Sequence, residues 1–479
     1  MINRKFTFFL IFLLIPILSS GQQNNVLFFM HTVPEANFVN PAVQNSCKYF
    51  IGLPVISSVH FNYGNTGFSY NQLFKKASGA DYYTADIDNV VKRLSKVNYI
   101  STELQSTILA LGYRRDYNYF TFSVIEKNNI AASYPKDLAT LIWKGNSTFE
   151  GREANLNGTG VLLNHYREYA LGYSHQAGDN KTFGIKGKLL FGKLNVTTKK
   201  SNSTLFTDAN TFNLLFNSDV SVNTSLPVNI TTNAQGRITD ISYNDAVSLS
   251  QLIFNRRNWG LAVDAGFIFE YNDRVTLSGS ILDLGFIRWR SNQNNYLQNG
   301  QLFYTGIPAD SLLNGNYLQG LLDAFNNAFQ FNLTHNSYTL FLPPRVYLGG
   351  TYIMNERLNI GMLYSGIIYY NRINSAFTLS ANAAVNKSLD ASVSYSYINK
   401  SLNNVGAGIA IGRSPVQFYM VTDNILGFIW PLSARNINLR FGLNLIFGCK
   451  VKENNRSSEC FWIKEAEQRR ERMKRLLHK

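Results

Sequence analysis

The feature that most constrains the fold is the run Ile437–Phe447 near the end of the chain. Every second residue is apolar and most residues between them are polar or small. The apolar positions are Ile437, Leu439, Phe441, Leu443, Leu445 and Phe447. A period of two predicts a β-strand with one apolar face. Eleven residues is also about the length of a tilted strand that crosses a bilayer. The pattern recurs through most of the chain, which predicts an all-β, transmembrane antiparallel β-barrel.

The first residues are typical of an export signal. Arg4 and Lys5 precede an apolar run over residues 6–18, and Ser19 and Gly21 occupy the positions of small residues before a cleavage site. The sequence therefore predicts a signal peptide at 1–21 rather than a membrane helix.

Composition agrees with an exported barrel. Aromatic residues make up 14% of the chain, with 27 Tyr and 34 Phe, which suits a lipid-facing surface with interfacial girdles. The formal net charge is +15. Export and the scattered positions of the charges disfavour nucleic acid as a partner. We expect basic residues near the rims to meet anionic headgroups or lipopolysaccharide phosphates, which makes outer-membrane lipid the first predicted partner.

The barrel is predicted over residues 49–448, with about 14 (14–16) strands. The strands come most densely near the end, at 345–354, 357–370, 372–385, 388–399, 403–412, 415–422 and 435–448. A first strand is expected at 51–63, with Pro54 tolerable only at a bulge, edge or beginning. The alternation slips near Asp283, which predicts a bulge. Residues 195–250 leave two alternatives open, tall strands or mobile loops.

Other segments interrupt the pattern. Residues 22–48 are mostly irregular, and short helices are predicted at 86–95 and 135–143. Residues 291–343 form the longest interruption and contain a helix candidate, 310–329, which could cap the barrel or fold inward.

Polar residues opposite the apolar faces are predicted to line the lumen. The candidates are His60, Asp264, Glu270, Asp390 and Arg440. They would set the electrostatics of an open pore or form buried pairs in a filled one.

No motif predicts catalysis, a cofactor or a metal. The sequence lacks a Walker A loop, a GxSxG elbow and an HExxH pair, and its six histidines are dispersed. We therefore predict a protein that is not an enzyme, and leave open a catalytic Ser or carboxylate cluster with His assembled across strands at one rim.

The chain has three cysteines, Cys47, Cys449 and Cys460. Cys449 and Cys460 are the candidate disulfide, because they could close a small loop beyond the last strand. Free thiols are the alternative.

Residues 449–479 form a basic tail that is predicted to be helical and periplasmic. Residues 450–479 hold ten Lys or Arg against five Glu, a net charge of +5. The candidate partner-binding residues are Trp462, Arg469, Arg470, Arg472, Lys474 and Arg475. The tail could bind the inner leaflet, the cell wall or an envelope protein, or it could be a solvated extension.

Two stretches resemble a known family. They are PEANFVNPAVQ at 34–44, followed by IGLPVISS at 51–58, and PVQFYMVTDNILGFIWPLSARNINLRFGLNLIFG at 415–448. Together they resemble an uncharacterised family of Bacteroidota outer-membrane barrels, known as a domain of unknown function. The NPA element at 40–42 is similar to one in long-chain fatty-acid transporter barrels. The element Asp423-Asn424 and the ending Gly442–Gly448 are similar to those of type IX secretion and gliding barrels.

The transporter resemblance implies a 14-strand barrel whose N-terminal segment, here 22–48, plugs the lumen. Asn37, Asn40, Pro41 and Ala42 are the plug candidates. The implied function is binding or translocation of a hydrophobic small molecule. The alternative is a non-transporting partner barrel of a type IX secretion, gliding or other envelope complex, which docks through its tail. Either way, the expected location is the outer membrane of a Gram-negative bacterium with both termini in the periplasm.

Overall fold

The computed structural model describes residues 24–449, apart from 77–78, 80, 234–237, 246, 306–328, 370–371, 387, 399–400 and 413. The predicted signal peptide, the basic tail beyond Cys449 and nearly all of the helix candidate at 310–329 lie outside the described residues. Among the residues described, no helix is long and apolar enough to span a membrane.

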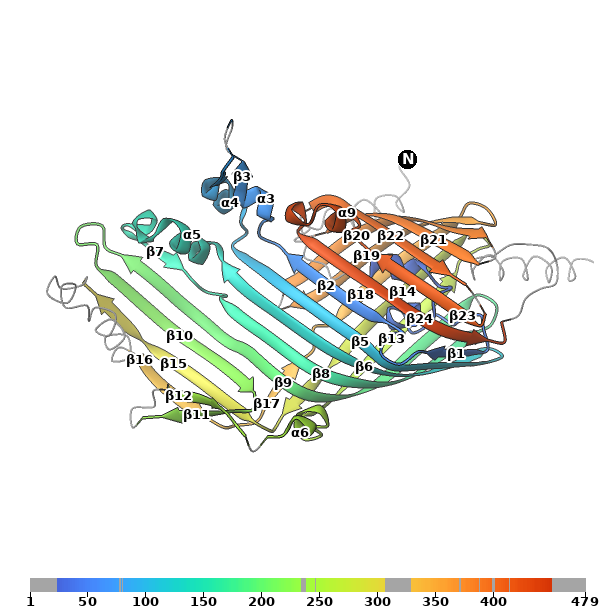
Figure 1. The fold of residues 1–479 in the computed structure, drawn as a ribbon, viewed down its shortest axis with the longest axis horizontal. Coiled ribbons are helices and arrows are strands. Elements are labelled where there is room, and N and C mark those ends of the chain that lie inside the picture. Colours follow the sequence, from blue (N-terminus) through green and yellow to red (C-terminus); the bar gives the residue numbers. More distant parts are fainter. Residues whose placement is uncertain are drawn as a thin grey trace, which may run out of the picture.

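A closed antiparallel ring of 14 strands forms the body of the molecule (Figure 1). Each strand pairs with its neighbours, and the last strand closes on the first. The ring consists of β1 (Tyr49–Gly52) with β2 (Val59–Asn65), β5 (Val97–Arg115), β6 (Asn118–Pro135), β8 (Gly160–Ala177), β9 (Lys181–Thr207), β13 (Trp259–Glu270), β14 (Val275–Trp289), β18 (Arg345–Ile353), β19 (Leu358–Tyr369), β20 (Arg372–Asn386), β21 (Leu389–Ile398), β22 (Ser401–Ile411), β23 (Val416–Thr422) and β24 (Asn436–Phe447).

The two faces of the ring differ in polarity as the alternation predicts. On β24 the polar residues Asn438, Arg440 and Asn444 are buried inside, while Phe441 and Phe447 are exposed outside. Large apolar side chains remain exposed on nearly every strand of the ring. An apolar exterior around a polar interior is the pattern of a transmembrane β-barrel, because lipid replaces water outside.

The predicted first strand is interrupted in the structure. β1 and β2 are separated by residues 53–58, and each part pairs with β5 on one side and β24 on the other. Pro54 lies in this break, where Val55 has a positive φ of 68°. The proline lacks an N–H group for the ladder, so a continuous strand at 51–63 was the wrong prediction.

The predicted bulge at Asp283 is confirmed. The β13–β14 register shifts so that Asp264 faces two residues of β14, and Asp283 has a φ of 59°. Its backbone N–H donates to Asp264 Oδ1 at 2.8 Å, which stabilises the irregular turn of the strand.

The same sheet extends beyond the ring on one side. The first half of β9, up to Phe191, pairs with β13, and its second half pairs with β10 (Leu214–Ser225). The sheet continues through β15 (Gln293–Tyr304) and β16 (Phe329–Thr334), while β17 (Tyr338–Phe341) extends the pairing of β14. Of the alternatives for 195–250, tall strands are confirmed for β9 and β10. The interruption predicted at 291–343 is shorter than expected. It contains three strands, β15, β16 and β17, whose many polar residues hide the alternation.

Short elements occupy several of the connections between strands. The predicted helices are present as α4 (Ile87–Arg93) and α5 (Lys136–Lys144). The others are α3 (Tyr70–Leu73), β3 (Phe74–Lys76), β4 (Tyr83–Ala85), η3 (Asn146–Phe149), β7 (Arg152–Asn155), β11 (Val228–Thr232), β12 (Ile238–Tyr243), α6 (Leu249–Ile253), α9 (Leu426–Ile429) and η4 (Pro431–Ser433).

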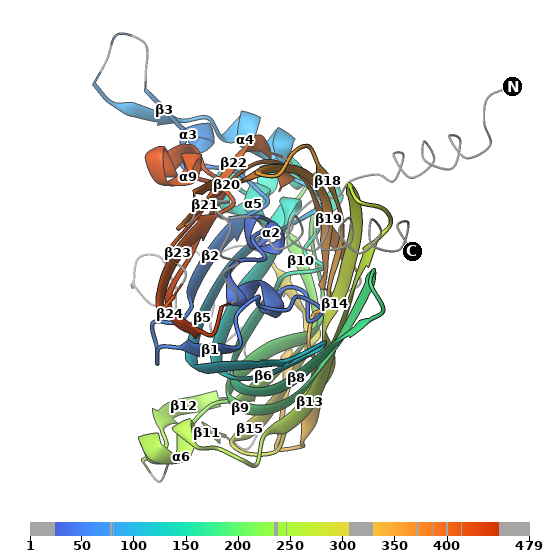
Figure 2. The same ribbon diagram turned by 90° about the vertical axis from the view of Figure 1, so that its right-hand side faces the viewer.

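The N-terminal residues lie inside the ring rather than on it (Figure 2). They contain α2 (Asn25–Phe29) and η2 (Pro34–Phe38), joined by turns. Almost all side chains between Asn24 and Asn45 are buried. We call residues 24–46 the inner segment.

Candidate functional site in the barrel lumen

The inner segment packs on the wall mainly through apolar side chains. Its apolar residues form one buried cluster with wall residues of β13, β14, β18, β19, β22 and β23. The members are Val26, Leu27, Phe28, Phe29, Met30, Val33, Ala36, Val39, Ala42, Val43, Ile268, Leu282, Tyr347, Leu363, Ala410, Tyr419 and Val421. This packing removes from water the lumen surface that the segment covers.

The wall facing α2 is built from small residues. A Cβ atom added to Gly361 would lie 2.3 Å from Phe29 Cε1, and one added to Gly349 would lie 2.6 Å from Phe28 Cε1. On β22, a Cβ at Gly408 would meet Met30 Sδ at 2.5 Å. The missing side chains make room for the aromatic residues of the segment.

Carboxylates fix the segment at two points. Asp423 accepts hydrogen bonds from the backbone N–H groups of Asn25 (3.2 Å) and Val26 (2.8 Å) at the start of α2. Glu35 is fully buried and accepts from Asn444 Nδ2 at 2.9 Å and Ser57 Oγ at 3.2 Å. Both carboxylates therefore join the segment to the barrel wall near the first and last strands.

The structure brings the four predicted plug residues together in one turn. Asn37 Nδ2 donates to the carbonyl oxygens of Pro41 (3.1 Å) and Val43 (2.8 Å), and Asn40 Oδ1 accepts from the N–H of Ala42 at 3.0 Å. The turn packs closely against two glycines of the barrel wall. A Cβ at Gly184 would meet the Pro41 carbonyl at 2.2 Å, and one at Gly266 would meet Asn40 Oδ1 at 2.1 Å.

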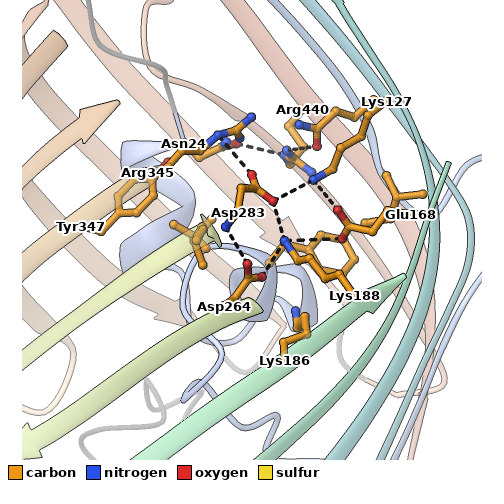
Figure 3. Close-up of a pocket in the computed structure, with 15 residues that line it drawn as sticks. Asn24, Lys127, Glu168, Lys186, Lys188, Asp264, Asp283, Arg345, Tyr347 and Arg440 are labelled. Carbon is orange, nitrogen blue, oxygen red and sulfur yellow. Dashed lines mark hydrogen bonds and ion pairs between the residues drawn. The ribbon is translucent and has the colours of Figure 1, made fainter. Parts of the chain in front are cut away.

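A buried network of charged side chains fills the space that the segment leaves (Figure 3). Lys188 lies at its centre, with Nζ 2.7 Å from Asp264 Oδ2 and 2.6 Å from Asp283 Oδ1. Lys127 Nζ is 2.7 Å from Glu168 Oε2 and 3.5 Å from Asp283 Oδ1. All five side chains are almost fully buried, and mutual pairing is what makes such burial tolerable.

The network also includes residues of β5, β18 and β24, and it reaches the inner segment. Arg345 Nη2 lies 2.9 Å from Glu103 Oε1, and Arg440 Nε donates to Asn24 Oδ1 at 3.1 Å. Lys186 Nζ donates to the carbonyl of Asn37 at 3.0 Å. The cavity that these residues enclose has a volume of about 30 Å³, room for little more than water.

Four of the five predicted lumen residues are buried inside the barrel. Asp264 and Arg440 belong to the network, and Asp390 lies among the neutral polar residues of β21. His60 is 1% exposed, and neither ring nitrogen has a hydrogen-bond partner within the described part of the chain. Glu270 continues the inward alternation of β13, but it ends the strand at the rim and is half-buried.

The sequence analysis missed most of the network. The missed residues are Glu103, Lys127, Glu168, Lys186, Lys188, Asp283 and Arg345. A usable signal was present on β9, where Lys186 and Lys188 alternate with Ile185 and Leu189 and therefore occupy the polar face.

The disulfide differs from the predicted one. Cys449 bonds to Cys47, 402 residues earlier, and not to Cys460, which lies outside the described residues. The reason is the strand register. Tyr49 pairs with Phe447 where β1 closes on β24, so the residues two positions beyond meet. The bond ties the end of the inner segment to the last strand of the ring.

Within the described residues, no group of three or more His, Cys, Asp or Glu side chains is arranged to hold a metal ion. The closed ring, its apolar exterior and its filled polar interior define an outer-membrane type of β-barrel.

Residues 41–423 match a family of unknown function (DUF5723), and the chain belongs to this family. No curated protein matches the sequence. Among solved structures, a FadL homologue from Pseudomonas aeruginosa is 12% identical, with 91% of this chain and 99% of that one covered and a TM-score of 0.38. The toluene transporter TbuX of Ralstonia pickettii is 9% identical, with 86% and 94% covered and a TM-score of 0.40. The toluene transporter TodX of P. putida is 10% identical, with 86% and 94% covered and a TM-score of 0.39.

Proposed function

We propose that this protein is a gated outer-membrane barrel that binds a hydrophobic small molecule and lets it pass when the inner segment moves. The observation that carries the proposal is that a piece of irregular chain fills the part of the lumen that the charged side chains of the ring leave open. The segment has no β-ladder to the wall and is held by side-chain contacts and isolated hydrogen bonds. Such contacts can be exchanged without opening the ring.

The apolar cluster supports the choice of ligand class. If the segment moved away from the wall, it would uncover Ile268, Leu282, Tyr347, Leu363 and Val421 inside the barrel. An apolar molecule could then replace the side chains of α2 on a surface already shaped for them.

The Cys47–Cys449 bond is compatible with a segment that moves but stays attached to the barrel. It fixes the C-terminal end of the inner segment at one end of the ring. Residues 24–46 are then a tethered chain whose other end is held near Asp423. We place this tethered end, with both chain termini, on the periplasmic side of a Gram-negative outer membrane, as expected for an even number of strands.

The test locks the segment to the wall. A Cβ at Gly406 would lie 2.8 Å from Val26 Cγ2, so the pair Val26→Cys and Gly406→Cys is close enough for a disulfide. We expect the oxidised double variant to lose uptake of radiolabelled oleate into cells that lack their own fatty-acid transporter, because α2 can no longer move. Wild type is expected to take up oleate, and so are the two single variants.

Reduction provides the matched control. Dithiothreitol should restore uptake by the double variant, and wild type treated in the same way shows the effect of opening Cys47–Cys449 alone. Uptake by the locked protein equal to wild type would contradict gating by the segment. Absence of uptake by wild type for oleate, toluene and other apolar probes would contradict the transport function itself.

The filled lumen favours a second candidate, a partner barrel that transports nothing and docks on another envelope protein. The predicted docking element is the basic tail, and its type IX connection stays a prediction. Purification in mild detergent, intact and with residues 450–479 deleted, separates the two candidates. A stoichiometric partner that is lost with the tail supports docking, and a lone barrel in both preparations contradicts it.

A further inference from the structure

One row of residues on the outside of the barrel breaks its apolar surface. The register places Glu126, Arg167, Phe191, Trp259 and Arg288 side by side on β6, β8, β9, β13 and β14. These strands lie next to one another in Figure 1. Arg167 and Arg288 each stand between two buried, inward-facing neighbours, so their own side chains face outward. We call these five residues the outer row.

The outer row lies at one edge of the membrane-spanning band. β13 runs eleven residues from Trp259 to Phe269 before the turn at the other end, which is one crossing of a bilayer by a tilted strand. Between the row and the turn that joins β13 to β14, the same strands expose only apolar side chains over several positions. These are Leu171, Phe183, Ile185, Leu189, Leu261, Val263, Phe267, Leu277 and Leu284. Above it come exposed arginines, among them Arg256, Arg257 and Arg290. The row therefore lies at the level of lipid headgroups.

Cations exceed anions along this edge. Glu126 Oε2 lies 2.8 Å from Arg167 Nε, and Glu126 Oε1 accepts from His165 Nε2 at 2.6 Å and pairs with Lys193. One carboxylate thus meets three basic side chains. Lys193 is buried there, because the β8–β9 register shifts beside it.

Two further arginines pair with no carboxylate within the described part of the chain. Arg288 donates to the hydroxyl groups of Thr339 (3.1 Å) and Ser337 (2.7 Å), while Arg290 stacks over Trp259, with 5.5 Å from its Cζ to the ring centroid. Pairs of arginines beside aromatic rings are suited to phosphate oxygens, because the guanidinium offers two parallel donors and the ring shields them from water.

This edge differs from the opposite side of the ring. There the outer ends of β23 and β24 carry the exposed apolar residues Phe428, Ile429, Trp430 and Leu432 of α9, η4 and their junction. Apolar residues at a rim make contact with lipid chains. An excess of arginines at a rim attracts anionic groups to that side of the barrel.

We propose that the arginines of this edge, Arg167, Arg288 and Arg290, bind the phosphate groups of a phosphorylated glycolipid of the outer leaflet, of the lipid A type. The acyl chains would lie along the apolar residues of the outer row's strands, and the phosphates would meet the three guanidinium groups. This site does not depend on transport through the lumen.

The test measures binding of purified hexa-acylated lipid A, which carries two phosphates, to the full-length barrel in detergent by native mass spectrometry. We expect the double variant Arg288→Gln with Arg290→Gln to bind lipid A more weakly by about tenfold or more, since each lost charge-assisted contact contributes roughly a factor of ten. The matched control is Arg274→Gln, an exposed arginine in the turn at the other end of the same β13–β14 hairpin. It should leave binding within about twofold of wild type.

Additional ligands and variants distinguish the outcomes. Weaker binding of lipid A from which the phosphates have been removed supports the proposal. Full competition by millimolar inorganic phosphate overturns the lipid assignment in favour of a free-anion site. Equal lipid A binding by wild type and the double variant, or an equal loss in Arg274→Gln, also overturns it. If the double variant does not fold, as judged by its heat-modifiable migration on gels, Arg290→Gln alone replaces it, because that side chain is exposed.

Discussion

The two halves of the barrel lumen are filled in different ways. Along β18–β23 the inward positions are mostly small, such as Gly361, Ser380, Ser394 and Gly408, and the inner segment occupies the space. Along β5–β14 many inward positions are long and charged, and these side chains fill most of the space themselves, although the segment also contacts Gly184 and Gly266 there. A 14-strand ring has more interior than side chains alone can fill on every side, and close packing requires one solution or the other.

The difference separates a fixed half of the lumen from an exchangeable one. The charged residues belong to strands of the ring and cannot leave without breaking it. The inner segment belongs to no strand, and it is joined covalently to the ring only at its C-terminal end, through the chain into β1 and the Cys47–Cys449 bond. The comparison therefore predicts that changes on the segment alter permeability, whereas changes in the network alter the stability of the barrel.

Deletion of residues 24–46 should have the largest effect. The side lined by small residues would be left empty, and water and ions would enter a barrel that is closed in the wild type. We expect stable conductance steps in planar lipid bilayers for the deletion variant and none for the full chain. The single variant Cys47→Ser, which removes the disulfide while the segment stays joined to β1, should conduct rarely or not at all. A deletion variant that is folded and remains non-conducting would show that the charged half closes the lumen alone.

The second effect concerns the charged half. Lys188→Met removes the cation shared by Asp264 and Asp283 and leaves two buried carboxylates short of a partner. The free energy of unfolding should fall by about 3–5 kcal/mol, as for other broken buried pairs. Lys181→Met, at the exposed end of the same strand, should change it by less than about 1 kcal/mol. Urea unfolding of the detergent-solubilised barrel measures both. Equal stabilities would mean that the network contributes little to holding the ring together.

The third effect depends on pH. Glu35 lies on the inner segment, and its burial raises the pKa of the carboxyl group to about 7 from an ordinary value near 4.5. Because the folded state binds the proton more tightly than the unfolded state, stability is highest below pH 4.5 and falls as the pH rises towards 7. We expect the part of the segment's protection from protease that depends on Glu35 to be greater at pH 5 than at pH 8, opposed by His31 on the same segment, whose pKa burial lowers to about 4. Glu35→Gln, which stays neutral, should remove most of this pH dependence, and its persistence in that variant would assign it to another group.

Alternation alone predicted the wall of the barrel well. The strands from β18 to β24 begin and end within two residues of the predicted positions, because one face meets lipid and the other the interior at every step. The same pattern missed β15, β16 and β17, whose polar residues and short length weaken the signal. It also predicted β1 and β2 as one strand. The six irregular residues between them leave the apolar positions of both strands in the same alternating register, so the break cannot be seen in the pattern.

The interior was harder to predict than the wall, because its contacts depend on register and closure. Lys188 and Asp283 are 95 residues apart, and only the β9–β13–β14 order brings them together. The Cys47–Cys449 bond needs the ring to close before its partners meet. The polar face of each strand was visible in the sequence, but the partner across the lumen was not.

The smallest predicted effect tests the shape of the exchangeable half directly. Gly361→Ala places a Cβ 2.3 Å from Phe29 Cε1, and Gly350→Ala on β18 places one in ordinary contact at 3.5 Å from Leu277 Cδ2. We expect Gly361→Ala to weaken docking of the segment by about 1–3 kcal/mol, the usual cost of overpacking, while the ring stays intact. Hydrogen exchange of residues 25–30 should accelerate in Gly361→Ala and match wild type in Gly350→Ala. Similar exchange in both variants would mean that Phe29 can turn aside, and that small wall residues do not hold the segment by their fit. A faster exchange confined to α2, with the strands unchanged, would show that the segment moves independently of the ring, as gating requires.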